Sequence, residues 1–377
     1  MKSVLIAAAA ALLYASVPAA ALPAPQPPEI AARAYLLVDF QSGATLAARD
    51  PDTRVEPASL TKLMTAYLTF KAVREGRLKL DQQLTVSEKG WKTEGSRMFL
   101  DPKKPATVAE LIRGMIVQSG NDACITLAEA IAGSEATFAE MMNQEARRLG
   151  MKGSRYMNST GLPHPDHYTT ARDLAVLSGA IIREFPEFYP IYSLKEYRYN
   201  NITQPNRNLL LFRDPEVDGM KTGHTESAGF CLVATKRHQN RRVVSVLLGA
   251  RSEKIRAEES AKLLGYGVQF FETPKLFTGG EALAKPQVYK GASDTVAVGF
   301  DSDRYVTLTR GQSGRLQKQI VLREPLIAPL AKGQQVGSVR VLLDGRPLLE
   351  LPLTTLAAVP EAGWFGRSAD AVKLWFR

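Results

Sequence analysis

The sequence contains little cysteine, and this excludes one class of exported protein. Its 377 residues include two cysteines, Cys124 and Cys231. Two cysteines cannot build the dense disulfide framework of small secreted domains, and a chain of this length can bury a core that does not need one. The sequence does not show whether the two pair, and we expect both to be small buried hydrophobic side chains.

Long apolar runs are also missing, and the apolar stretch near the N-terminus is short. Lys2 precedes an apolar stretch at residues 4–13, and small residues follow at positions 19–21. This stretch is too short to cross the roughly 30 Å hydrocarbon layer of a bilayer as an anchor. The pattern is that of a secretory signal peptide, which predicts removal of residues 1–21 and export of the rest.

Basic stripes are absent, although the formal net charge is +10. A nucleic-acid-binding protein would carry an arginine- and lysine-rich stripe, so we expect no nucleic acid partner. The positive charge suits an anionic membrane surface or a substrate that carries carboxylates. Solubility alone is an equally good explanation, because charge by itself does not separate these functions.

The first part of the mature chain has the pattern of one α/β layer domain, which we place at residues 30–273. The expected strands lie at residues 34–39, 44–48, 219–222, 229–235 and 243–248. The expected helices lie at residues 59–73, 108–117, 123–131 and 253–271. Strands at both sequence ends with helices between them predict a layered α/β domain.

A small all-β domain of sandwich type is expected to follow at residues 282–359. The segment 273–285 has the composition of a linker, with Pro274, Gly279 and Gly280. Beyond it the apolar residues alternate with a period of two, and Asp344-Gly345 is a strong hairpin signal. This pattern predicts several short strands and no helix.

The last segment, residues 361–377, differs from both domains. On a helical wheel Trp364, Phe365, Trp375 and Phe376 share one side, and charged residues share the other. An amphipathic helix with aromatic and basic residues suits the surface of a membrane, and it is too short and too charged to span one. The alternative is a helix that docks on the β domain.

Three short motifs indicate a serine enzyme. They are Ser59-Leu60-Thr61-Lys62 at an expected helix start, Ser119-Gly120-Asn121 on a loop between helices, and Lys221-Thr222-Gly223 on a strand. Each motif alone is too common to carry weight. All three in this order, each on its expected element, form a strong signal for a serine nucleophile.

The proposed chemistry explains why these residue types are needed. Residues three apart on a helix share a face, so the Lys62 amine can reach the Ser59 hydroxyl and remove its proton. Lysine acts as a base only if its pKa is lowered, and we expect the neighbouring cation Lys221 and the helix N-terminus to lower it. Ser119 is expected to relay a proton to the leaving amine, and Asn121 to hold the substrate amide.

The third motif is expected to bind the substrate. Lys221 and Thr222 are candidates for binding a terminal carboxylate, which an exopeptidase must recognise. Gly223 is expected to let the substrate backbone lie against the strand edge. The main-chain N–H groups of Ser59 and His224 are candidate oxyanion donors. Taken singly, each residue also has an ordinary structural explanation, such as a helix cap, a turn or a surface cation.

Beyond the motifs, the sequence resembles the low-molecular-mass penicillin-binding proteins that are serine D,D-carboxypeptidases. The resemblance is carried by the segments 57–65, 118–124, 206–210 and 217–225. It implies a catalytic domain of the serine β-lactamase/transpeptidase type, hydrolysis of the terminal D-alanine of peptidoglycan stem peptides, acylation by β-lactams, and no cofactor or metal. It also implies that Arg207 helps hold the terminal carboxylate, and that the protein is periplasmic and peripherally bound to the inner membrane.

Four other functions were weighed against this one. A class A β-lactamase needs a deacylating glutamate, but the segment 154–158 offers no carboxylate, so we expect β-lactams to acylate Ser59 and to leave slowly. A zinc peptidase is disfavoured because the H-x-x-H of His164 and His167 lies among prolines and lacks a third ligand. A D,D-endopeptidase would use the same catalytic groups and stays open. A wall-binding protein without activity would be favoured by the loss of a motif residue, and none is lost.

Overall fold

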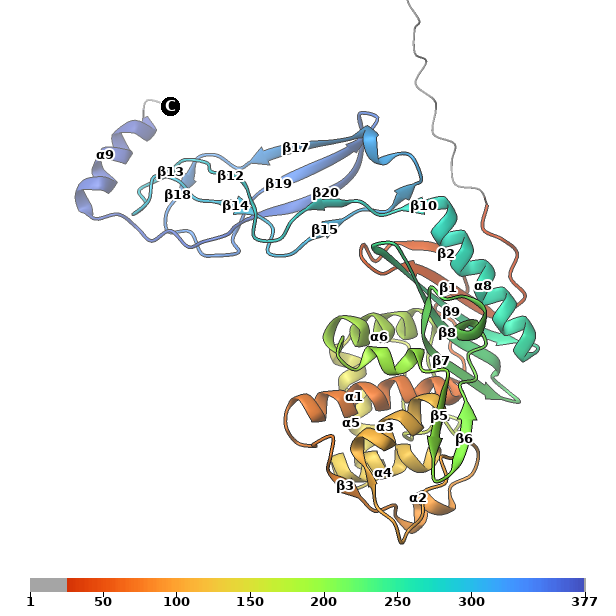
Figure 1. Cartoon of the computed structure of the whole chain (residues 1–377). Helices are drawn as coiled ribbons and strands as arrows, with labels where there is room; N and C mark the ends of the chain where they lie inside the picture. Colours follow the sequence, from red (N-terminus) through yellow and green to blue (C-terminus); the bar gives the residue numbers. More distant parts are fainter. Residues whose placement is uncertain (1–25, 376–377) are drawn as a thin grey trace, which may run out of the picture.

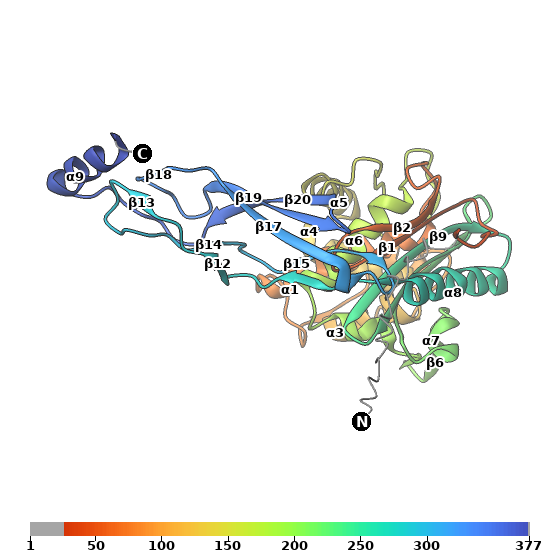
Figure 2. The ribbon, with the colours of Figure 1, turned by 90° about the horizontal axis from the view of Figure 1, so that it is seen from above.

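The computed structural model of the protein describes residues 26–375, so the expected signal peptide at residues 1–21 lies outside the described residues. Figure 1 shows a mixed α/β domain and an elongated β-rich domain that extends away from it. The view from above in Figure 2 shows the same elongated arrangement, with the C-terminal helix at the far end of the β-rich domain. The predicted order of an α/β domain followed by a β-rich domain is confirmed.

The α/β domain is built on a five-stranded antiparallel sheet with the order β2-β1-β9-β8-β7. Its strands are β1 (Ala34–Asp39), β2 (Thr45–Arg49), β7 (Val217–Thr225), β8 (Gly229–His238) and β9 (Arg241–Ala250). The pairing of β1 with β9 joins segments that are about two hundred residues apart, so strands from both sequence ends form one sheet of a single layered domain. Strand β7 is left at one edge of the sheet, where a ligand can reach it.

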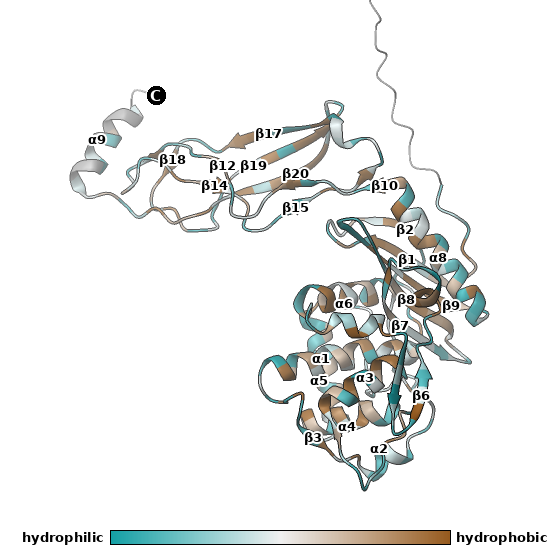
Figure 3. Cartoon of the chain, in the orientation of Figure 1, coloured by the Kyte–Doolittle hydropathy of each residue, from teal (hydrophilic) through white to brown (hydrophobic). Residues whose placement is uncertain are grey.

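Helices cover both faces of this sheet. Helix α8 (Glu253–Phe270) packs on one face and α6 (Ala171–Glu184) on the other. The remaining main helices form a cluster beyond α6: α1 (Lys62–Arg74), α2 (Glu88–Lys92), α3 (Val108–Val117), α4 (Asn121–Ala132) and α5 (Glu135–Arg148). Each face of the sheet buries its own apolar cluster, and Figure 3 shows brown, hydrophobic stretches along the strands of the sheet and along the helices that cover it.

Short elements connect these parts. In the α/β domain they are η1 (Ala58–Thr61), β3 (Gln83–Leu84), β4 (Ala106–Thr107), η2 (Tyr189–Ser193), β5 (Glu196–Tyr199), β6 (Ile202–Pro205) and α7 (Leu210–Arg213). The predicted helix over residues 59–73 therefore begins as a 3-10 turn, and the α-helix starts at Lys62. Ala58, whose φ of 48° is left-handed, begins this turn directly before Ser59.

The β-rich domain contains a five-stranded sheet and three short strand pairs. The sheet has the order β12 (Ala282–Ala284), β14 (Val298–Gly299), β20 (Arg346–Thr355), β19 (Gln335–Leu343) and β17 (Leu316–Leu322). The pairs are β10 (Phe271–Glu272) with β16 (Leu308–Thr309), β11 (Lys275–Phe277) with β15 (Arg304–Tyr305), and β13 (Val288–Tyr289) with β18 (Leu326–Ile327). The turn η3 (Ser313–Arg315) precedes β17.

Two features of this domain bear on the sequence predictions. Asp344 and Gly345, with φ of 52° and 76°, turn the β19–β20 hairpin as their pair predicted. The segment expected to be a linker instead carries β11 and β12. Strands of two or three residues show too little alternation to be read from sequence, and they form here because later strands pair with them.

Helix α9 (Trp364–Trp375) ends the described chain. It lies beside β13, where the Lys290 main-chain N–H donates to Asp370 Oδ2 at 2.7 Å. Trp364 and Trp375 are 68% and 86% exposed. In the stretch from residue 26 to residue 375, no helix has both the length and the apolar character needed to cross a membrane.

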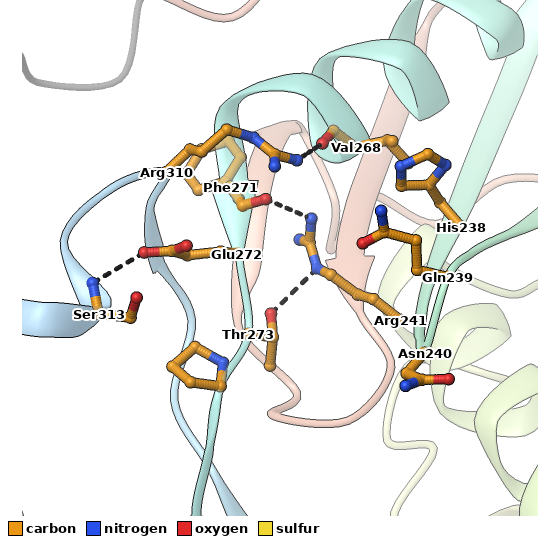
Figure 4. A pocket seen from close by; sticks show the side chains of 11 residues that line it. His238, Gln239, Asn240, Arg241, Val268, Phe271, Glu272, Thr273, Arg310 and Ser313 are labelled. Carbon is orange, nitrogen blue, oxygen red and sulfur yellow. Dashed lines mark hydrogen bonds between the residues drawn. The ribbon is translucent and has the colours of Figure 1, made fainter.

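Two arginines join the domains at the C-terminal end of α8 (Figure 4). The last four carbonyl groups of a helix have no partner within it. Arg241 Nη1 donates to Gly267 O, while Arg310 donates from Nη2 to Val268 O, from Nε to Gln269 O and from its main-chain N–H to Phe270 O. Because Arg241 belongs to β9 and Arg310 follows β16, one cap is supplied by both domains.

A buried carboxylate completes this junction. Asp39, with no exposed surface, accepts hydrogen bonds from Ser42 Oγ, Arg241 Nε and Thr273 Oγ1 at 3.0, 2.7 and 2.7 Å. Thr307 of the β-rich domain lies 2.6 Å from Ser42 Oγ and 3.0 Å from Thr273 Oγ1. Asp39 thus orders the side chains of the α/β domain, the connecting segment and the β-rich domain together.

We predict that Arg241→Ala lowers the free energy of unfolding by about 3–5 kcal/mol, because it leaves the Asp39 carboxylate buried without a cation. Denaturant unfolding measures the change. Arg340→Ala is the matched control, since Arg340 is 53% exposed and its ion pair with Glu350 spans 3.6 Å. The control is expected to cost about 0.5 kcal/mol or less. Equal losses in the free energy of unfolding of the two variants would contradict the proposed contribution of the junction to stability.

Candidate active site

The first motif forms a tight turn that aims a lysine at a serine. Lys62 Nζ donates to Ser59 Oγ at 2.9 Å and to Thr160 O at 2.6 Å. Lys62 is 2% exposed, and Ser59 is half-buried in η1. The left-handed Ala58 before Ser59 is held by Gly161, where an added Cβ would lie 1.8 Å from Ala58 O. The predicted contact between the amine and the hydroxyl is present in the structure.

The second motif lies on the loop between α3 and α4. Ser119 has a φ of 60°, an uncommon conformation for a residue with a side chain, and its Oγ accepts a hydrogen bond from Lys221 Nζ at 3.0 Å. Asn121 begins α4, and its Nδ2 donates to Glu94 O at 2.6 Å. Both side chains are buried. The strained loop therefore brings Ser119 to the lysine of the third motif.

The third motif runs along the edge strand β7. Lys221 and Thr222 are buried, while His224 is exposed and its ring stacks 4.0 Å from the Phe230 ring. Besides the role toward the substrate expected from the sequence, Gly223 has a packing role. A Cβ at Gly223 would lie 3.1 Å from Pro57 O and 3.2 Å from the Leu60 side chain, so the glycine lets β7 approach η1 closely.

The electrostatics of the two lysines differ from the sequence expectation in one respect. Burial is the largest cause that lowers the pKa of Lys62, to about 8, and the charge of Arg207 lowers it further. The causes expected from the sequence were the charge of Lys221 and the helix N-terminus. Burial also lowers the pKa of Lys221 well below its usual value, and there the charge of Lys62 adds to the effect. Burial makes a neutral amine accessible near neutral pH.

Arg207 lies on the exposed side of the site. Its Nη1 donates to Ser96 Oγ at 2.7 Å, and its main-chain carbonyl accepts from Arg256 Nη2 at 3.1 Å. Its charge acts on the pKa of both buried lysines. The structure therefore brings Arg207 to the same site as Lys62 and Lys221.

Several residues of the site were not found from sequence. Thr160 contributes through its main-chain carbonyl, which every residue has, so its identity gives no signal. Asp122 is buried and accepts from the main-chain N–H groups of Met98 and Leu100 at 2.9 and 3.1 Å. These bonds hold the segment that supports Asn121. A charged residue at a helix start beside a motif was the signal that could have pointed to Asp122.

The H-x-x-H motif does not resemble a metal site. His164 Nδ1 accepts from the Asp166 main-chain N–H at 3.1 Å, and His167 Nε2 lies 3.0 Å from Thr61 Oγ1. Within residues 26–375 no three histidine, cysteine, aspartate or glutamate side chains come together as metal ligands. Both cysteines are free and buried, as expected for small hydrophobic side chains.

Comparison with known proteins gives the same assignment for both domains. The peptidase S11 family, described as D-alanyl-D-alanine carboxypeptidase, matches residues 22–252, and the penicillin-binding protein 5 C-terminal domain matches residues 271–361. The chain is 41% identical over 360 residues to D-alanyl-D-alanine carboxypeptidase DacA of Escherichia coli (strain K12), covering 93% of this chain and 89% of that protein.

Solved structures of related proteins have the same architecture. Penicillin binding protein 5 from Haemophilus influenzae is 41% identical and superposes with a TM-score of 0.86 over 89% of this chain and 99% of that one. Penicillin-binding protein D2 from Listeria monocytogenes, solved in its ampicillin-bound form, is 29% identical with a TM-score of 0.59, covering 64% of this chain and 98% of that one. With its serine and lysine motifs gathered in one site, the chain belongs to the peptidase S11 family of serine-type D-alanyl-D-alanine carboxypeptidases.

Proposed function

We propose that this carboxypeptidase removes the terminal D-alanine of peptidoglycan stem pentapeptides through an acyl-enzyme on Ser59. The observation that carries the proposal is the 2.9 Å contact between Lys62 Nζ and Ser59 Oγ, made by an amine whose pKa is lowered to about 8. A neutral lysine at this distance is a competent general base for a serine hydroxyl.

The reaction starts with proton transfer from Ser59 Oγ to Lys62 Nζ. The serine oxygen attacks the carbonyl carbon of the scissile bond, and the main-chain N–H groups of Ser59 and His224 stabilise the oxyanion. Ser119, hydrogen-bonded to Lys221 Nζ, relays this proton from Lys62 to the amine of the departing D-alanine, which leaves Lys62 neutral again. The acyl group stays on Ser59 until a water molecule, deprotonated by the same base, hydrolyses the ester.

Recognition of the substrate uses the cations and the edge strand. Thr222, Gly223 and His224 on β7 lie along the substrate backbone, and Asn121 holds its amide. Arg207 attracts the terminal carboxylate through its opposite charge, and Lys221 and Thr222 donate hydrogen bonds to it. A free carboxylate next to the cleaved bond defines a carboxypeptidase substrate. A cross-linking D,D-peptide bond would present the same carbonyl, so endopeptidase action is the second candidate.

β-Lactams acylate the same serine in this proposal. Among the described residues, the hydrogen-bond partners of Lys62 Nζ are Ser59 and Thr160, and no carboxylate contacts Ser59. A class A β-lactamase uses a glutamate there to hydrolyse the acyl-enzyme. Release of a bound penicilloyl group is therefore slow.

We further propose that the protein is exported to the periplasm and lies on the inner membrane through α9. The support is the exposure of Trp364 and Trp375 at the end of the elongated β-rich domain, far from the α/β domain (Figure 1). Tryptophan side chains on an amphipathic helix favour the interface of a bilayer. The positive net charge favours an anionic surface.

Ser59→Ala is expected to abolish release of D-alanine from a peptide ending in D-Ala-D-Ala, because no nucleophile is left to form the acyl-enzyme. Liberated D-alanine and covalent labelling by fluorescent penicillin measure the effect. Ser193→Ala, at an exposed serine that hydrogen-bonds Pro190 O, is the matched control and keeps both activities. Persistent D-alanine release by Ser59→Ala would overturn the proposed function.

The rate constant of acylation is expected to rise with pH up to about pH 8 and then level off. Only neutral Lys62 accepts the serine proton, and its pKa is lowered to about 8, so the neutral fraction falls about tenfold for each pH unit below that value. Stopped-flow acylation by benzylpenicillin between about pH 6 and about pH 10 measures the profile, since the penicillin carboxylate stays ionised there. A flat profile would rule out Lys62 as the base.

A chain that ends at Gly363 is expected to bind vesicles containing phosphatidylglycerol about tenfold more weakly than the full chain, with unchanged D-alanine release. Cosedimentation measures the binding. The double variant of Trp364→Ala and Trp375→Ala keeps the charge of α9 and is expected to lose binding as well. Undiminished cosedimentation of both variants would contradict a membrane role for α9.

A further inference from the structure

One segment of the α/β domain contacts the chain both before and after the turn that carries Ser59. We call residues 158–169 the clamp segment. At its start Thr65 Oγ1 donates to Ser159 O at 2.6 Å, and at its end Thr169 exchanges two main-chain hydrogen bonds of 2.9 Å with Val55. Val55 precedes η1 and Thr65 follows it by one helical turn. The clamp segment is therefore attached to the chain on both sides of the nucleophile.

His167 is the side chain that the clamp segment inserts into this turn. Its Nε2 lies 3.0 Å from Thr61 Oγ1, and the two side chains are 3% and 0% exposed. The Tyr156 ring contacts the imidazole edge-on, with centroids 5.7 Å apart. Thr61 is the residue immediately before Lys62. A hydrogen bond to Thr61 thus acts one residue away from the proposed base.

The imidazole of His167 makes a directional hydrogen bond and carries no charge. Burial lowers its pKa to about 4, and the charges of His164 and Lys62 lower it further. Its Nδ1 is fully buried, and no hydrogen-bond partner for it lies among residues 26–375. A proton on that nitrogen would be a buried donor without an acceptor. His167 therefore stays neutral while it holds Thr61.

The nucleophile turn needs support from outside. Neither η1 nor α1 begins with a hydrogen bond from a capping side chain, and Ala58 is left-handed. Helix starts commonly depend on such a cap for about 1 kcal/mol. The turn is held instead by Gly161, which packs against Ala58 O, and by His167 on the other side of Thr61.

We propose that His167 is a positioning residue for the reaction: its hydrogen bond to Thr61 fixes the first turn of α1, so that Lys62 Nζ stays within hydrogen-bond distance of Ser59 Oγ. The inference rests on the proposed roles of Ser59 and Lys62. It gives the second histidine of the H-x-x-H motif a part in catalysis that involves no metal. His167 touches neither the substrate nor the reacting atoms.

Two substitutions at one position separate this role from simple packing. In His167→Gln the side-chain amide can occupy the place of Nε2, whereas in His167→Asn it can reach only the place of Nδ1. We expect the second-order rate constant for acylation by benzylpenicillin to fall about tenfold in His167→Asn and to stay within about twofold of wild type in His167→Gln. Rescue by the residue that restores one hydrogen bond is the signature of positioning.

Thr61→Val removes the hydroxyl partner of this hydrogen bond and completes a double-mutant cycle with His167→Asn. We expect a loss of about tenfold in this variant, and no further loss in the double variant with His167→Asn, because both changes break the same hydrogen bond. If His167→Asn does not fold, Thr61→Val together with His167→Gln carries the test. Melting temperatures establish that each variant is folded.

Ser154→Ala is the matched control. Ser154 Oγ hydrogen-bonds Thr169 Oγ1 at 2.8 Å and Asp173 Oδ2 at 2.7 Å, so it supports the end of the clamp segment without touching Thr61. It is expected to lower the melting temperature and to keep the wild-type acylation rate. The inference is overturned if His167→Asn is acylated at the wild-type rate or if His167→Gln is as slow as His167→Asn. It is also overturned if the rate losses of His167→Asn and Thr61→Val add up in the double variant. A wild-type protein that is not acylated would defeat the proposed function itself, which is a different result.

Discussion

The site depends on keeping one amine uncharged inside the protein. Lys62 is 2% exposed, and burial alone disfavours its charged form. Two oxygen atoms, Ser59 Oγ and Thr160 O, accept its hydrogen bonds, and no carboxylate among residues 26–375 forms an ion pair with it. An ion pair there would restore the ammonium form and remove the base. Much of the surrounding architecture follows from the need to enclose this amine without neutralising it by a counter-charge.

Enclosing the amine requires segments that are distant in sequence and backbone conformations that residues with side chains rarely adopt. Ala58 and Ser119 have φ of 48° and 60°. Such conformations cost of order 1–3 kcal/mol each and persist where neighbouring structure determines them. Gly161 holds the first and Asp122 supports the chain next to the second. Close backbone packing at Gly161 and the side-chain hydrogen bonds of Asp122 thus hold these two conformations.

Sequence patterns predicted the parts of this structure that depend on composition and period. The five strands of the α/β sheet, the helix over residues 108–117 and the three motifs lie where they were expected. The short strands β11 and β12 were missed, because tertiary pairing forms them. The sequence placed Lys62 beside Ser59 correctly but assigned the lowered pKa to a neighbouring cation. Burial depends on which segments converge, and a linear pattern does not contain that information.

The shared cap on α8 has a consequence for the molecule as a whole. Turning the β-rich domain about the connecting segment would withdraw Arg310 from three carbonyl groups and open the contacts of Thr307. The Arg310 side chain is exposed, so each of these hydrogen bonds contributes about 0.5–1.5 kcal/mol. A rotation between the two domains would therefore have to break this cap, so the junction links the orientation of the tail helix to that of the sheet that bears the serine site.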